Sequence, residues 1–193
     1  MTKNFGKNEE RTSEYLKKFN REKVLKLLVD SNSPTILDVG ANNGSSLVEF
    51  KKWWPNSKVH CFEPQSECWD ELDDLSNEFT NVHINKFALG NKNDESKEFY
   101  SHDLNTGISG FNKINIESKD SIDLSKLSND SKSLENHKKT INHKRNVQVK
   151  RLDEYIKNDK NINQIDLLKI DTQGYELEIL EGLGTELNKV RIL

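Results

Sequence analysis

The sequence predicts an α/β fold with a mostly parallel, twisted sheet covered by helices on both faces. Short apolar runs alternate with amphipathic stretches along the chain, and the first apolar run ends in a glycine-containing loop that leads into a helix. Alternation of this kind implies right-handed crossovers between parallel strands. At 193 residues the chain is long enough for one domain and short for two.

The first element is a helix in an N-terminal segment, residues 1–33. Its apolar residues are spaced close to the helical period and predict an amphipathic helix from Ser13 to Asp30; they are Leu16, Phe19, Val24, Leu27 and Leu28. Residues 31–34 break this helix, because Pro34 disfavours it. The main domain, residues 34–193, follows.

The main domain begins with the strand Thr35–Val39, a glycine loop, and a helix over 45–54 with Ser45 or Ser46 near its N-terminus. The pattern then repeats as strand "KVHCFEP", helix "SECWDELDDLSNEF" and strand "NVHINKFAL". A polar insertion at about 91–146 contains one convincing strand, "SKEFYS". Loops of this length are usually functional or disordered, so we expect it to cross the ligand end of the sheet, with part of 118–146 mobile.

Regular structure returns with "NVQVKRLDEYI", which predicts a strand and a short helix, and with the strand "QIDLLKID". The helix "TQGYELEILEGL" follows, and the chain stops within "KVRIL", another apolar strand. A final strand of this kind predicts an exposed edge. We therefore expect either a longer natural protein or a covered edge, and pairing with a second copy of the chain fits the same feature.

Charge and composition narrow the classes of partner. The 29 basic and 32 acidic residues give a net charge of -3, without the dense basic stripe that a nucleic acid needs. No signal-like apolar run and no window of about 20 apolar residues is present, which predicts a cytoplasmic protein without a membrane span. Cys61 and Cys68 lack CxxC spacing and are expected to be reduced thiols.

The loop in "ILDVGANNGSS" carries the main functional signal. The dinucleotide pattern G-x-G-x-x-G would fall on Gly40, Asn42 and Ser45, and only the first is glycine. The pattern acid-x-G-x-G-x-G fits better, because Asp38, Gly40 and Gly44 match it and only Asn42 differs. Asn tolerates a left-handed backbone better than other non-glycine residues, so the turn can be kept.

Two acidic residues indicate which ligand the loop binds. Asp38 would repel a pyrophosphate but attract an ammonium group, such as that of S-adenosylmethionine. Glu63 ends the second strand, where an acid can accept hydrogen bonds from both hydroxyls of an adenosine ribose. Together they favour S-adenosylmethionine over NAD. The alternative is that Asp38 caps a turn and Glu63 is a solvated strand end.

With these residues in place, the chain resembles the FkbM-type family of S-adenosylmethionine-dependent methyltransferases from about Pro34 to its end. The resemblance rests on "LDVGANNG", "FEP", "FALG", "VKRLDEYI" and especially "LLKIDTQGYELEIL". It implies a Rossmann-like class I methyltransferase fold of seven strands, here apparently truncated after the fifth. It also implies O-methylation of sugar, polyketide or related hydroxyls, and a set of cofactor-binding residues: Asp38, Gly40, Asn42, Asn43, Gly44, Glu63, Pro64 and Ala88.

The candidate catalytic residues follow the strand "LLKID". Asp171 lies at the carboxyl end of this strand, where open α/β sheets place ligands, and Lys169 projects to the same side. We expect an ion pair between them that fixes Asp171 beside the sulfonium, or else a buried salt bridge that only organises the strand end. Glu176 is a third candidate, although the helix macrodipole alone explains a carboxylate there. Gln173 stands where the family usually has Glu.

Other polar residues are weaker candidates. His102, His137 and His143 of the insertion could supply a base, although solvated loop histidines are commoner, and no cluster predicts a metal site. "NTGISGFN", with Ser109, suits close approach of backbone to ligand or forms an ordinary turn. "DTQG" differs from the N/D-P-P-Y/F/W motif of nucleobase amino-methyltransferases, which argues against base methylation.

The leading hypothesis is therefore an S-adenosylmethionine-dependent O-methyltransferase that acts on a hydroxyl of a glycan or secondary metabolite. One alternative is a truncated or degenerate cofactor-binding domain without activity, which the abrupt C-terminus favours. The other is an NAD-dependent oxidoreductase, which Asp38 and the missing glycines disfavour.

Overall fold

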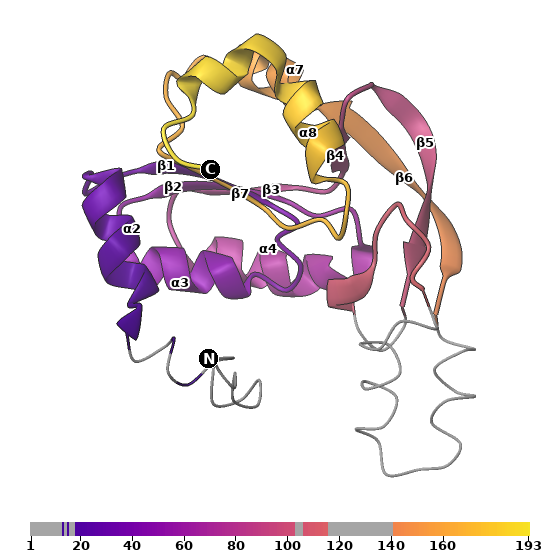
Figure 1. The fold of residues 1–193 in the computed structure, drawn as a ribbon, viewed down its shortest axis with the longest axis horizontal. Helices are drawn as coiled ribbons and strands as arrows, with labels where there is room; N and C mark the ends of the chain where they lie inside the picture. Colours follow the sequence, from indigo (N-terminus) through magenta and orange to yellow (C-terminus); the bar gives the residue numbers. More distant parts are fainter. Residues whose placement is uncertain (1–12, 14, 16–17, 103–105, 116–140) are drawn as a thin grey trace, which may run out of the picture.

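The computed structural model describes residues 13, 15, 18–102, 106–115 and 141–193. A parallel sheet of four strands, in the order β3-β2-β1-β7, lies at its centre (Figure 1). The strands are β1 (Thr35–Val39), β2 (Lys58–Phe62), β3 (Val82–Asn85) and β7 (Leu167–Ile170). The predicted α/β class with a parallel sheet between helices is confirmed.

Helices cover both faces of this sheet (Figure 1). One face packs against α3 (Ser45–Trp53) and α4 (Trp69–Glu78), and the other against α7 (Leu152–Asn158) and α8 (Glu176–Leu183). Alternate residues of β1 enter the two cores, since Ile36 packs with Phe50 and Leu37 packs with Leu168. Both faces being buried explains why the strands are apolar runs without alternation.

A second sheet contains the strands that flank the polar insertion. It has the order β4-β6-β5, from β4 (Ala88–Gly90), β5 (Asp94–Ser101) and β6 (His143–Arg151). The single strand predicted over "NVHINKFAL" is wrong, because β3 ends at Asn85 and β4 pairs with β6 in the other sheet. β3 ends where its partner β2 ends, since Asn85 lies opposite Phe62.

The N-terminal helix differs from its prediction. Phe19 and Asn20 lie outside a helix, and α2 spans Arg21–Val29. Asn20 interrupts the pattern because its side chain accepts a hydrogen bond from Lys23 N (2.9 Å) and so caps a new helix. Leu27 and Leu28, predicted on the apolar face, are 80% and 52% exposed, while Val29 is buried.

The last residues pair with β7 only briefly. The short 3-10 helix η3 (Gly184–Lys189) leads to a parallel bridge between Val190 and Ile165. Leu168 N then donates to Ile192 O (2.9 Å). Two further 3-10 turns, η1 (Ser66–Cys68) and η2 (Thr106–Ile108), lie beside the strand ends. Residues 118–140 of the expected mobile stretch lie outside the described residues.

Candidate functional site

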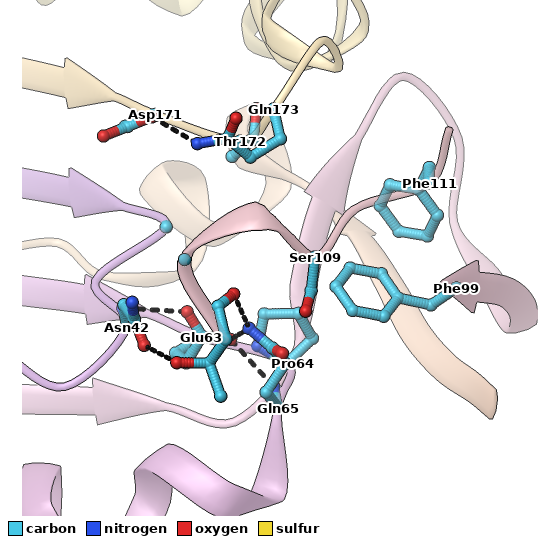
Figure 2. A pocket seen from close by; sticks show the side chains of 13 residues that line it. Asn42, Glu63, Pro64, Gln65, Phe99, Ser109, Phe111, Asp171, Thr172 and Gln173 are labelled. Carbon is cyan, nitrogen blue, oxygen red and sulfur yellow. Dashed lines mark hydrogen bonds between the residues drawn. The ribbon is translucent and has the colours of Figure 1, made fainter. Parts of the chain in front are cut away.

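A hollow of about 100 Å³ lies at the carboxyl ends of the parallel strands and opens to solvent. This position is typical of ligand sites in open α/β folds. In Figure 2 the residues Asp171 to Gln173 lie above, Asn42, Glu63 and Gln65 lie below, and the rings of Phe99 and Phe111 lie together at the right-hand end. The lining residues are Gly40, Asn42, Glu63, Pro64, Gln65, Phe99, Thr106, Gly107, Ser109, Phe111, Asp171, Thr172 and Gln173.

The glycine loop after β1 forms the floor of the hollow. Gly40 has φ 77°, and a side chain at this position would place its Cβ 2.0 Å from the carbonyl oxygen of Asp171. Only glycine therefore lets the loop pack against the end of β7. Asn42 has φ 48°, the left-handed conformation expected for it.

Glu63 is buried in the hollow (2% exposed) and holds two loops in place. Its Oε2 accepts from Asn42 N (2.8 Å) and its Oε1 from Gln65 N (2.9 Å), as Figure 2 shows. Burial raises the pKa of Glu63, although the hydrogen bonds from the amides of Gln65 and Asn42 act in the opposite direction. From the described residues Oε2 accepts only the bond from Asn42 N, so the carboxylate can still accept a hydrogen bond from a ligand hydroxyl through Oε2.

The insertion closes over the loop through Thr106. Its hydroxyl donates to Asn42 Oδ1 (2.6 Å), and its carbonyl oxygen accepts from Gln65 Nε2 (3.1 Å). Gln65 Nε2 also donates to Glu63 Oε1 (3.2 Å), so two acceptors fix the orientation of this amide. Gln65 Oε1 is then buried without a protein partner, and an unpaired buried acceptor costs about 1–3 kcal/mol. A ligand with a hydroxyl or amino donor would relieve that cost.

The predicted ion pair between Lys169 and Asp171 is wrong. Lys169 Nζ instead donates to Asp38 Oδ1 (2.8 Å) and to Gly40 O (3.3 Å), because Lys169 lies directly opposite Asp38 on the neighbouring strand. Neighbouring strands are about 4.8 Å apart, whereas residues i and i+2 of one strand are about 6.6 Å apart. Asp171 lines the hollow and accepts from Gln173 Nε2 (3.3 Å).

Asp38 does not reach the hollow. It is 0% exposed and absent from the lining, and its Oδ2 has no partner. Burial raises its pKa, although the nearby ammonium of Lys169 acts in the opposite direction. The expected direct attraction of a ligand ammonium by Asp38 therefore has no support from its position, and the carboxylate instead anchors Lys169 beneath the glycine loop.

The structure uses several other predicted residues to build the fold around the hollow. Asn43 Oδ1 accepts from Ser45 Oγ (2.7 Å). Gly44 is the N-cap of α3 and Ser45 is its first residue, which agrees with the expectation of Ser45 or Ser46 near the start of the helix. Ala88 is buried in the core of the second sheet with Phe99. Asn43, Gly44, Ser45 and Ala88 do not line the hollow.

The remaining predicted residues also lie outside the hollow's lining. Glu176 accepts hydrogen bonds from the turn at 171–174. His102 directly follows β5 and His143 is the first residue of β6, and neither lines the hollow. His137 falls outside the described residues. The hollow thus brings together five of the residues predicted for cofactor binding or catalysis, Gly40, Asn42, Glu63, Pro64 and Asp171, and it also includes Ser109 of the predicted segment "NTGISGFN".

The wall that faces the glycine loop comes from the insertion, as expected, but sequence reasoning missed two of the residues that line the hollow, Gln65 and Phe99. Gln65, adjacent to the "FEP" motif, could have been found from its position after the strand. Phe99 is hidden in a strand of the insertion, and its T-shaped contact with Phe111 (5.3 Å) depends on tertiary packing. Phe111 also lies 4.4 Å from the ring of Tyr175, which fixes it at the edge of the hollow.

The described part of the chain contains neither of two other kinds of feature, a cluster of metal-ligating side chains and a membrane-spanning helix. Among those residues, no group of three or more His, Cys, Asp or Glu side chains could hold a metal ion. No helix there is both long and apolar enough to cross a membrane.

Comparisons with known proteins agree on the kind of protein. The chain is 27% identical over 165 residues to the methyltransferase sdnD of Sordaria araneosa and covers 62% of it. It is 24% identical over 171 residues to the 2-O-methyltransferase NoeI of Sinorhizobium fredii and covers 64% of it. These matches span 80% and 86% of this chain, so the chain spans less than two thirds of either relative.

Among solved structures, a methyltransferase FkbM from Methylobacillus flagellatus matches 79% of this chain and 29% of its own length, with 15% identity and a TM-score of 0.45. The family model of the methyltransferase FkbM domain matches residues 38–193. This match begins at the acid before the glycine loop and includes the strand ends that line the hollow. The chain therefore belongs to the FkbM methyltransferase domain family.

Proposed function

We propose that this domain binds S-adenosylmethionine in the hollow and serves the methylation of a hydroxyl group on a glycan or secondary metabolite. The family supports methyl transfer, and the name of the relative NoeI, a 2-O-methyltransferase, supports oxygen as the acceptor atom. The observation that carries the proposal is the buried carboxylate of Glu63, which shares one hollow with the glycine loop and Asp171.

The residues of the hollow fit an adenosine better than a dinucleotide phosphate. Glu63 would accept hydrogen bonds from the ribose hydroxyls, and the unpaired Gln65 Oε1 would accept one more. A buried carboxylate in the hollow disfavours a pyrophosphate there. When bound, S-adenosylmethionine supplies an electrophilic methyl group on a sulfonium.

The protein's part in the reaction is to align an acceptor oxygen and to exclude water. Asp171 directly follows β7 and lines the hollow, and its carboxylate could accept the proton of a hydroxyl group bound there. Gln173 Nε2 holds that carboxylate from the same turn. Phe99 and Phe111 form an apolar end that leaves little room for water around the acceptor.

Calorimetric titration of the chain with S-adenosylhomocysteine and with NAD tests the proposal. We expect binding of S-adenosylhomocysteine and none of NAD. Binding of NAD alone would contradict the proposal in favour of an oxidoreductase. Binding of neither ligand would also contradict it, and would favour a degenerate domain.

A further inference from the structure

The turn Asp171–Gly174, which follows β7 and forms one wall of the hollow, has a strained backbone. Gln173 has φ 58° and Gly174 has φ 94°. Five non-glycine residues in the described part of the chain have positive φ, and Gln173 alone among them lacks the short side chain of Asn or Asp that tolerates it; the others are Asp30, Asn42, Asn81 and Asn142. Such a conformation persists only where neighbouring groups hold it.

Glu176 holds the turn in this conformation through hydrogen bonds. Its Oε1 accepts from Thr172 N (3.0 Å), from Gly174 N (3.1 Å) and from Thr172 Oγ1 (3.3 Å). Burial acts to raise the pKa of Glu176, but hydrogen bonds from backbone amides, its own included, outweigh burial and hold the pKa below its ordinary value. The ionised carboxylate thus closes the turn from outside the hollow.

The same turn lies between the glycine loop and the insertion. Gly40 approaches it so closely that an added Cβ would lie 2.0 Å from Asp171 O. On the other side, a Cβ at Gly110 would lie 3.3 Å from Thr172 O, and Asn112 Nδ2 donates to Gly174 O (3.0 Å). A displacement of the turn would therefore move both walls of the hollow.

We propose that Glu176 is a positioning residue: it holds the strained turn in the form that seats the glycine loop against β7 and keeps Asp171 at the edge of the hollow. It takes no proton from substrate, since its side chain does not line the hollow. The ligand used in the test, S-adenosylhomocysteine, rests on the proposed function. The role of Glu176 in holding the turn does not depend on that function.

Two substitutions separate the reach of the side chain from its charge. Glu176→Asp keeps the charge at the start of α8 but is one methylene too short to reach both amides, whereas Glu176→Gln keeps the reach and an acceptor oxygen. Glu178→Asp is the matched control, because Glu178 lies in the same first turn.

Two measurements follow these variants. In the ligand-free protein, amide hydrogen exchange at Thr172 and Gly174 should speed up about tenfold or more in Glu176→Asp and change little in the other two. Affinity for S-adenosylhomocysteine, measured by calorimetry, should fall about tenfold in Glu176→Asp and stay within about threefold of wild type in Glu176→Gln and the control.

The outcomes distinguish the two proposals. If wild type does not bind S-adenosylhomocysteine, the proposed function fails, and the exchange data still decide the role of Glu176. If wild type binds and Glu176→Asp exchanges and binds like wild type, the positioning role is refuted. A general rise in exchange across α8 and β7 would also refute it, because it would show a purely structural role.

Discussion

The four-stranded parallel sheet and the three-stranded sheet each form one side of the hollow, but they supply different chemistry. The parallel sheet contributes polar groups that directly follow its strands: Gly40, Asn42, Glu63, Gln65 and Asp171. The other side comes from β5 and the loop after it, with Phe99, Thr106 and Phe111. Backbone turns fix the first side, whereas packing between aromatic side chains fixes the second.

Under the proposed function, we expect changes to the parallel sheet to affect folding and cofactor binding, and changes to the opposite wall to affect mainly the acceptor. Among the residues that the structure describes, Thr106 joins the two sides by a direct side-chain bond to the glycine loop, while the turn at 171–174 touches both through its backbone. The following predictions test this division, beginning with the largest effect.

The largest expected effect concerns His60, which is buried in the parallel sheet. Its Nδ1 lies 2.7 Å from Tyr155 Oη, its ring stacks on His83 at 4.6 Å, and its Nε2 is buried without a partner. Burial and the nearby His83 lower the pKa of His60 to about 4, Lys58 adds to this, and Asp159 opposes it. In the unfolded chain the pKa of His60 is near 6.5, so as the pH falls the unfolded chain binds a proton at His60 before the folded protein does.

The contribution of neutral His60 to stability is therefore present above pH 6.5 and is lost as pH falls through about 4. The loss amounts to about 3 kcal/mol. Denaturant unfolding between pH 7 and pH 4 should show a flatter dependence for His60→Phe than for wild type. His143→Gln, an exposed imidazole on β6, is the control. Parallel pH curves for His60→Phe and wild type would contradict this assignment.

The next effect concerns Glu63. Glu63→Gln replaces one of the two acceptor oxygens with an NH2 group, which cannot accept from a backbone amide, so either the loop at Asn42 or the loop at Gln65 loses its support. We expect affinity for S-adenosylhomocysteine to fall about 30-fold, or about 2 kcal/mol. Calorimetry measures this, with the exposed Glu71→Gln on α4 as the control. An unchanged affinity would remove Glu63 from the cofactor side.

The smallest effect is a gain in stability at the wall between the two sides. Gln173→Gly relieves a left-handed conformation, worth about 1 kcal/mol, which should raise the melting temperature by about 2–4 °C. It also removes the amide that holds Asp171, so methyl transfer should fall while S-adenosylhomocysteine affinity holds. Asn81→Gly, another position with positive φ, is the control. A variant that is no more stable would show that Gln173 is unstrained.

The sequence alone was a good guide to the parallel sheet and its turns. The strand Thr35–Val39, the helix after the glycine loop and the left-handed Asn42 all followed from local patterns. Each depends on residues near in sequence: an apolar run, a start signal, or a side chain that tolerates positive φ. The single helix predicted from Ser13 to Asp30 is instead interrupted at Phe19 and Asn20, also for a local reason, because the side chain of Asn20 caps a new helix.

The tertiary structure alone decided which partners these residues have. Lys169 pairs with Asp38 because strand order sets β7 beside β1, and no local spacing contains that order. Ala88 lies in a core because β4 pairs with β6 in the three-stranded sheet and does not continue β3. Phe111 is held at the edge of the hollow by its contact with Tyr175. The sequence determined the turns that can bind a cofactor, since those depend on backbone conformation. The tertiary structure decided which carboxylates face the hollow, since that depends on strands distant along the chain.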